Sequence, residues 1–88
     1  MNPEESPLQF PCDFPIKAFG RDTGDFDDLV LALVNEHAPE VTRDMLSTRS
    51  SRAGRYVAVT VNLRARSRDQ LDRIYRALSA HERVLAAL

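Results

Sequence analysis

The chain has 88 residues, 43% of them hydrophobic and 28% charged, which is an ordinary composition for one globular domain. No apolar run approaches the roughly 20 residues that span a bilayer, and the acidic residues 1–5 lack the apolar segment of a secretory signal. The single cysteine, Cys12, cannot form an internal disulfide. We therefore expect a cytoplasmic protein that makes no membrane contact.

The net charge of −1 conceals an uneven distribution of charge along the chain. Residues 1–48 contain three basic and ten acidic side chains, whereas residues 49–88 contain nine arginines and three acidic side chains. Such a division can mark an anion-binding face, or neighbouring elements can neutralise it within the fold. We favour neutralisation within the fold.

The first half of the chain predicts an arm, a strand and a helix. Residues 1–12 contain three prolines and no hydrophobic period, which predicts an extended arm before a single domain at residues 13–88. Residues 14–20 alternate in the manner of a strand, and a turn follows. Asp25 is the expected N-cap of a helix that ends before Pro39. Apolar steps of three and four residues give this helix one buried stripe: Phe26, Leu29, Val30, Leu33, Val34 and His37.

Two strands joined by a hairpin are predicted next. Residues 43–51 contain few apolar side chains, which favours a weak strand at the edge of a sheet. A turn at residues 52–54 leads into residues 55–65, where valines alternate with more polar side chains. This alternation predicts a strand with one packed face and one partly exposed face.

A second helix and a last strand complete the pattern. Ser67 followed by Gln70 is a capping box and predicts a helix over residues 68–79. The apolar stripe of this helix consists of Leu71, Ile74, Tyr75 and Leu78. Residues 82–88 are mostly apolar and predict a short closing strand.

The order strand, helix, strand, strand, helix, strand predicts an α+β, ferredoxin-like βαββαβ fold. Right-handed crossovers place both helices on one face of a four-stranded antiparallel sheet of spatial order 4-1-3-2. The acidic first helix then lies near the arginine-rich second helix (Arg68, Arg73, Arg76), which supports internal neutralisation. The other face of the sheet would remain open and carry Lys17, Phe19, Tyr56, Ala58, Thr60, Leu85 and Ala87.

Three blocks of sequence resemble the YbeD-like family of small bacterial proteins. They are the stretch from Phe10 to Gly20, with its Phe-Pro pair and a lysine three residues before a glycine, then His37-Ala38-Pro39, then Ser50-Ser51…Gly54-x-Tyr56. The resemblance covers residues 8–88, and Ala53 departs from it by lengthening the hairpin by one residue. It implies a ferredoxin-like fold similar to ACT-type regulatory domains and suggests a regulatory role. It supplies no catalytic residues.

Two segments are candidate ligand sites. In ACT-type domains the loop after the first strand helps to form an effector pocket, and the corresponding residues here are Gly20, Thr23, Gly24 and Asp25. A turn followed by a helix cap is the simpler interpretation of this loop. The hairpin carries guanidinium and hydroxyl groups able to grip phosphate or carboxylate, and a solvated turn is again the simpler interpretation. The residues concerned are Arg49, Ser51, Arg52 and Arg55.

No residues form a catalytic or metal-binding pattern. His37 ends the first helical stripe, where its ring could satisfy terminal carbonyl groups, and His81 lacks ligand spacing to His37 or Cys12. The glycines fit neither the dinucleotide nor the P-loop motif. We therefore expect no cofactor, no metal and no enzymatic activity.

Two hypotheses of function follow from the open face of the sheet. The first is a regulatory or interaction module that docks a protein partner or a second copy, or that binds a small effector. The second is single-stranded nucleic-acid binding, with Phe19 and Tyr56 as stacking platforms. A pI near 6.1 and the absence of an aromatic-rich RNP1 signature count against nucleic acid.

Overall fold

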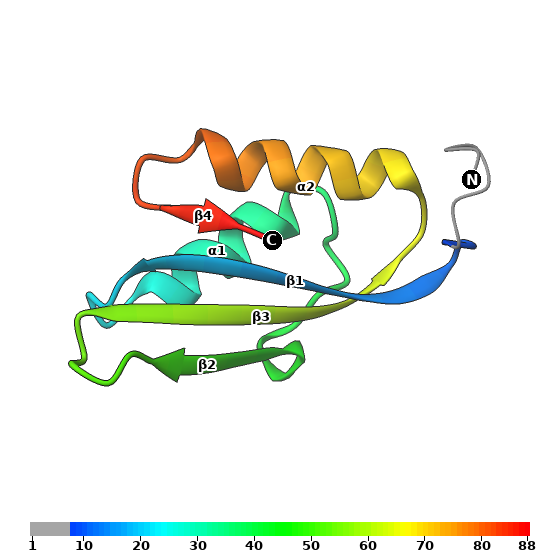
Figure 1. Cartoon of the computed structure of the whole chain (residues 1–88). Helices are drawn as coiled ribbons and strands as arrows, with labels where there is room; N and C mark the ends of the chain where they lie inside the picture. Colours follow the sequence, from blue (N-terminus) through cyan, green and yellow to red (C-terminus); the bar gives the residue numbers. More distant parts are fainter. Residues whose placement is uncertain (1–7) are drawn as a thin grey trace, which may run out of the picture.

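Residues 8–88 are described by a computed structural model, in which four strands form one antiparallel sheet of order β2-β3-β1-β4 (Figure 1). This is the predicted order 4-1-3-2 counted from the opposite edge. Residues 1–7 of the predicted arm lie outside the described residues. The elements are β1 (Cys12–Arg21), α1 (Phe26–Asn35), η2 (Arg43–Met45), β2 (Leu46–Ser50), β3 (Tyr56–Ala65), α2 (Arg68–Ala80) and β4 (Ala86–Ala87).

The long central pair β1 and β3 forms the frame of the sheet. The register runs without interruption from Cys12 opposite Ala65 to Arg21 opposite Tyr56. Because side chains alternate between the two faces of a strand, this register places one set of side chains from each strand on the helix side. Ile16, Val59 and Val61 of that set are fully buried, as the alternating valines predict.

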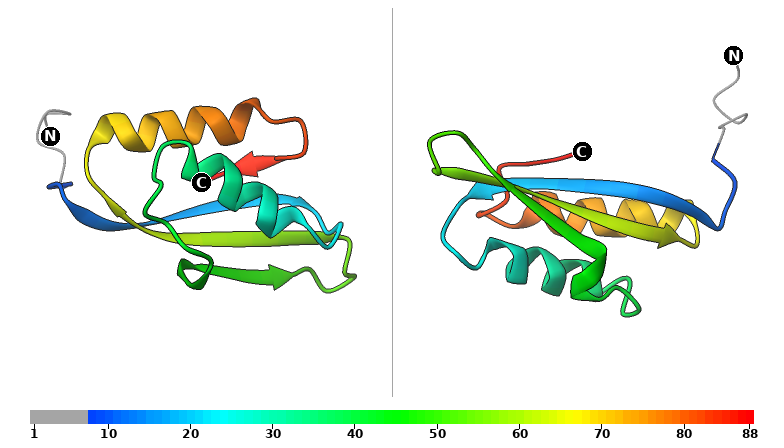
Figure 2. Two further views of the ribbon diagram at one scale, coloured as in Figure 1. Left: turned by 180° about the vertical axis from the view of Figure 1, so that it is seen from behind. Right: turned by 90° about the horizontal axis from the view of Figure 1, so that it is seen from below.

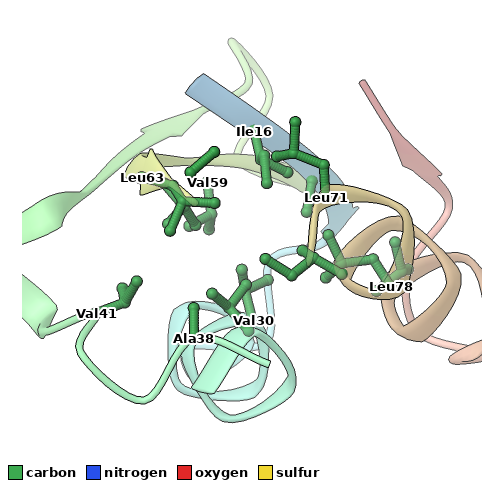
Figure 3. Packing of buried hydrophobic residues seen from close by; sticks show 14 of the residues in the cluster. Ile16, Val30, Ala38, Val41, Val59, Leu63, Leu71 and Leu78 are labelled. Atoms are coloured by element: carbon green, nitrogen blue, oxygen red, sulfur yellow. The ribbon is translucent and has the colours of Figure 1, made fainter. Parts of the chain in front are cut away.

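Both helices pack on the same face of the sheet (Figure 2). The stripes predicted for them supply the buried residues Phe26, Val30 and Val34 in α1 and Leu71, Ile74 and Leu78 in α2. Figure 3 shows these stripes meeting the sheet side chains in a single apolar cluster. The core therefore lies entirely on one side of the sheet, and the other side carries no helix within residues 8–88.

The start of α2 is anchored to the loop after α1 by Gln70, the one polar side chain among the buried residues described. The Ser67 hydroxyl accepts a hydrogen bond from the Gln70 backbone N–H, which confirms the predicted N-cap. The Gln70 side chain does not return to Ser67. Its Oε1 accepts from the Arg66 N–H at 2.7 Å, and its Nε2 donates to the His37 carbonyl at 3.1 Å.

The second strand begins later than predicted. Residues 43–45 form the short helix η2 in place of a strand, and β2 occupies only Leu46–Ser50. The Met45 N–H donates to the Thr42 carbonyl at 3.0 Å, and the Asp44 carboxylate accepts from the Thr42 hydroxyl. These local bonds turn the backbone before the strand starts. The predicted edge position of β2 is confirmed.

The uneven charge is partly neutralised within the fold, although not by the two helices facing each other. Asp27 and Asp28 of α1 pair with Arg43 of η2. Three arginines from the second half reach acidic residues of the first half, in the pairs Arg64–Asp13, Arg66–Glu40 and Arg83–Asp25. Within residues 8–88, no ion pair joins α1 to α2, and Arg73 pairs with Asp69 of its own helix.

Candidate functional site: the open face of the sheet

Three adjacent rows of side chains near the hairpin end of the open face carry the candidate site. Across the middle row, Ala58 of β3 lies between Arg49 of β2 and Phe19 of β1, and Ala86 of β4 follows Phe19. A second row runs from Ser47 through Thr60 to Lys17. In the third row Tyr56 lies opposite Arg21. The register thus brings together Lys17, Phe19, Tyr56, Ala58 and Thr60, the predicted members of the face from β1 and β3.

The prediction for the last strand is wrong by one residue. Lys17 and Leu88 exchange backbone hydrogen bonds at 2.8 and 2.9 Å, and Ala18 is opposite Ala87. Directly opposed residues share a face, so Leu88 lies on the open face and Ala87 on the helix side. Leu85 precedes β4, and its N–H bonds to the Phe19 carbonyl at 2.8 Å. It is exposed, but Ala86 occupies the place opposite Phe19.

The open face is hollowed where Ala58 lies between larger neighbours. One hollow of about 580 Å³ is bounded by the aromatic residues Phe19 and Tyr56 and by side chains of the hairpin, including Arg49 and Arg52. A second hollow of about 570 Å³ adjoins it and is lined by Lys17, Arg49 and Thr60 among others. Both hollows share Phe19, Arg49 and Ala58. Together they form a shallow, open surface.

Five cations on and beside this face lie outside the ion pairs of residues 8–88, whereas Arg64, at the far end of β3, pairs with Asp13. Among residues 8–88, the ion pairs include none of Lys17, Arg21, Arg49, Arg52 and Arg55. Of the hairpin serines, Ser51 accepts the Tyr56 N–H at its hydroxyl, and Ser50 donates to the Asp22 carboxylate. The hairpin predicted to bind anions therefore presents free guanidinium groups on a turn that its serines help to hold.

The predicted effector loop is occupied by a side chain of this chain. Arg83 Nη2 donates to Thr23 Oγ1 at 2.5 Å and to Asp25 Oδ1 at 2.6 Å. The hydrogen bonds from Arg83 and Thr23 lower the pKa of the Asp25 carboxyl to about 2. Asp25 occupies the predicted N-cap position of α1, but its side chain makes no cap hydrogen bond, because Arg83 and Thr23 hold its carboxylate. Gly20 is buried within β1 and lines no part of the loop surface.

The Asp25–Arg83 pair gives a pH-dependent prediction. Because the folded-state pKa of Asp25 is lower than its ordinary value of 3.8, the stabilisation is present above pH 3.8 and is lost as pH falls towards 2. We expect Asp25→Asn to be less stable than wild type at pH 7, and the two to converge near pH 2. Urea unfolding at several pH values measures this, and Asp72→Asn, an exposed carboxylate outside the described ion pairs, is the matched control. A gap between wild type and Asp25→Asn that is constant with pH contradicts the assignment.

The two histidines and the cysteine make no shared site in the described residues. His81 Nδ1 accepts the Arg83 N–H, and the carbonyl groups after α1 are satisfied by the Asn35 amide, not by the ring of His37. Cys12 is a free thiol at the start of β1. Within residues 8–88, no three His, Cys, Asp or Glu side chains gather in a metal-binding arrangement. Neither helix of the described part has the length and apolar character to cross a membrane.

Comparison with known proteins places the chain among relatives of unknown role. Residues 5–88 match the family model described as "Protein of unknown function (DUF493)". The chain belongs to this family. It is 44% identical to a UPF0250 protein of Paraburkholderia phytofirmans over 96% of the chain and 94% of that protein. It is also 44% identical to one of Nitrosomonas europaea over 97% of the chain and 98% of that protein.

The DUF493 assignment confirms the resemblance to the YbeD-like family of uncharacterised bacterial proteins. A Neisseria gonorrhoeae member is 41% identical over 92% of the chain and 89% of that protein. No solved structure matches the chain. The family name carries no activity, so the physical character of the open face has to guide a hypothesis of function.

Besides Ala86 and Leu88, sequence reasoning missed Arg21 on the open face and Arg83 at the predicted effector loop. Arg21 ends β1 opposite Tyr56 and adds a cation to the open face, which the alternation along β1 could have indicated. Arg83 closes the predicted effector loop from 58 positions away in the sequence, and no local signal connects it to Asp25.

Proposed function

We propose that this DUF493 protein is a non-enzymatic regulatory or interaction module that docks a protein partner on the open face of its sheet. The single observation that carries the proposal is the exposed apolar surface that crosses three strands. Tyr56 is 45% exposed and Leu88 is 69% exposed, and Phe19 and Ala58 lie between them. A partner that covers this surface would remove it from water, which favours association.

A regulatory role is supported by the similarity of the βαββαβ topology to ACT-type domains, which is an argument from fold alone. A small effector remains part of the proposal, with one restriction. A ligand bearing an amino group could reach Asp25 only by displacing Arg83, whose hydrogen bonds already use both carboxylate oxygens. An effector that binds without that displacement would have to use the hollows of the open face.

Single-stranded nucleic-acid binding is the second candidate. The observation that favours it is the proximity of the unpaired Lys17 and Arg49 to Phe19 and Tyr56. Both candidates use the same face and require no catalysis.

The proposal also places the chain in the cytoplasm, where a lone reduced cysteine is ordinary.

Site-specific photocrosslinking in living cells tests the docking face. We expect a photoreactive phenylalanine derivative at Tyr56 to give discrete adducts with one or a few proteins. The same group at Arg76, on the exposed side of α2, is the matched control and should give none of these adducts. Mass spectrometry of the adducts identifies the partner, or a second copy of this chain.

Two results would contradict the proposal. One is the absence of adducts from Tyr56 in a variant that folds normally. The other is an identical set of adducts from Tyr56 and Arg76, since this pattern indicates random collision without docking on the sheet.

A further inference from the structure

One end of the open face combines a basic border with an apolar centre. We call it the basic end and define it by its five cations: Lys17, Arg21, Arg49, Arg52 and Arg55. Lys17, Arg21 and Arg49 extend from β1 and β2 on the open side, and Arg52 and Arg55 lie in the adjoining hairpin. All five are exposed, and none forms an ion pair within residues 8–88.

Asp22, the carboxylate beside this end, can offset only one of its five cations. Asp22 follows β1, and its two oxygens accept hydrogen bonds from the Gly24 N–H and the Ser50 hydroxyl. Asp13 is at the opposite end of β1 and pairs with Arg64. Uncompensated positive charge on one end of a surface attracts an anionic partner and raises the rate of association with it.

Charge disfavours a second copy of this chain as the occupant. A symmetric dimer formed through the basic end would bring two sets of the same five cations together, and juxtaposed like charges are costly. A symmetric dimer centred further along the sheet would offer only Asp13 as a carboxylate from β1 and β3, and Asp13 is already paired.

The apolar centre favours a protein segment over nucleic acid. Proteins that bind single strands without base readout stack successive bases on several aromatic side chains. Here Tyr56 is the only aromatic residue among the exposed large hydrophobic residues described, and the others are Leu85 and Leu88. Phe19 is half-buried between Ala58 and Ala86. The small floor residue Ala58 leaves hollows suited to aliphatic or aromatic side chains that project from a peptide.

We propose that the open face binds an acidic amphipathic segment of a partner protein. Apolar side chains of that segment enter the hollows around Ala58, and its carboxylates pair with the basic end, where Arg49 and Arg52 offer bidentate geometry. The inference rests on the proposed docking function and adds the chemistry of the partner.

Selection from a random-peptide display library tests this chemistry while the partner itself is still unidentified. Wild type should enrich peptides that combine Asp or Glu with Leu, Phe or Trp. Binding of an enriched synthetic peptide should weaken at high salt. It should also fall by about tenfold or more in K17E/R49E, because the charge reversal turns attraction into repulsion.

Matched variants distinguish an effect of the basic end on binding from an effect of the protein's net charge. R68E/R76E makes the same change in charge on α2, with two exposed arginines outside the described ion pairs, and should bind as wild type does. R52E/R55E lies in the hairpin loop, so it reports on the basic end even if K17E/R49E fails to fold. Urea unfolding verifies the fold of each variant.

Three outcomes overturn the inference: enrichment without acidic residues, no enrichment at all, or equal loss of binding in R68E/R76E. Tighter binding of oligo(dT) than of any selected peptide, with the same loss in K17E/R49E, also overturns it and favours nucleic acid. Photocrosslinking at Tyr56 does not depend on the charge of the partner. An adduct with a partner that has no acidic segment would therefore disprove the inference and leave the docking function intact.

Discussion

Gly20→Ala is expected to destabilise the fold by about 3 kcal/mol, a large effect for the addition of one methyl group. A Cβ at this position would lie 2.3 and 2.6 Å from two ring atoms of Phe26 and 2.8 Å from the Arg83 backbone carbonyl oxygen. Phe26 is itself 2% exposed and lies at the start of α1, so its ring has little room to move. The position requires glycine because of this close approach, since its φ is not in the left-handed region.

Guanidinium unfolding of Gly20→Ala measures the loss of stability. Gly54→Ala is the matched control, because Gly54 has a φ of 73° but open space around its Cβ position. It should cost about 1 to 2 kcal/mol through backbone strain alone. A double-mutant cycle with Phe26→Leu isolates the clash, and the double variant should be more stable than the sum of the single effects predicts. Additive effects would place the cost of Gly20→Ala elsewhere.

The fold was predictable from the sequence where hydrophobic period and burial agree. The valines of β3 and the stripes of α1 and α2 repeat clearly, and their burial allows only one face for each element. Strand order then followed from the handedness of the crossovers. The same reasoning correctly assigned the open-face residues of β1 and β3, which form most of the candidate site.

Sequence-based prediction failed for side chains whose orientation or partner is not determined by the local hydrophobic pattern. Residues 84–88 are all apolar, so no alternation indicates which side chains face the helices. The predicted assignment of these side chains to the two faces was therefore wrong by one residue. Asp25 is the N-cap residue of α1 as predicted, but its carboxylate binds the distant Arg83 and makes no cap hydrogen bond. Of the ion pairs between the two halves of the chain, Arg66–Glu40 and Arg83–Asp25 join loops that meet only after folding, and Arg64–Asp13 depends on the register of β1 and β3. The two helices are neighbours as expected, but no ion pair within residues 8–88 joins them.

Gln70→Ala is the second substitution with a large expected effect, about 3 kcal/mol of lost stability. Gln70 is 5% exposed, and its amide satisfies the Arg66 N–H and the His37 carbonyl together. Removing the amide leaves the Arg66 N–H without this partner and the His37 carbonyl with the long 3.5 Å bond from Arg66 Nη2, and an unsatisfied buried group costs about 1–3 kcal/mol. Asn62→Ala is the control, because this exposed amide makes one long bond of 3.5 Å and should cost little.

Gln70→Glu distinguishes hydrogen bonding from packing at the same position. The ionised carboxylate of this variant could still accept from the Arg66 N–H but would set a buried negative charge against the His37 carbonyl oxygen. Burial and this repulsion raise the folded-state pKa of the new carboxyl above its unfolded value. Protonation restores a donor, so the variant should approach wild-type stability as pH falls from 7 to about 4. Urea unfolding at both pH values checks this. A deficit that does not shrink at the lower pH would mean that Gln70 matters for its shape, not for the hydrogen bonds that join α2 to the end of α1.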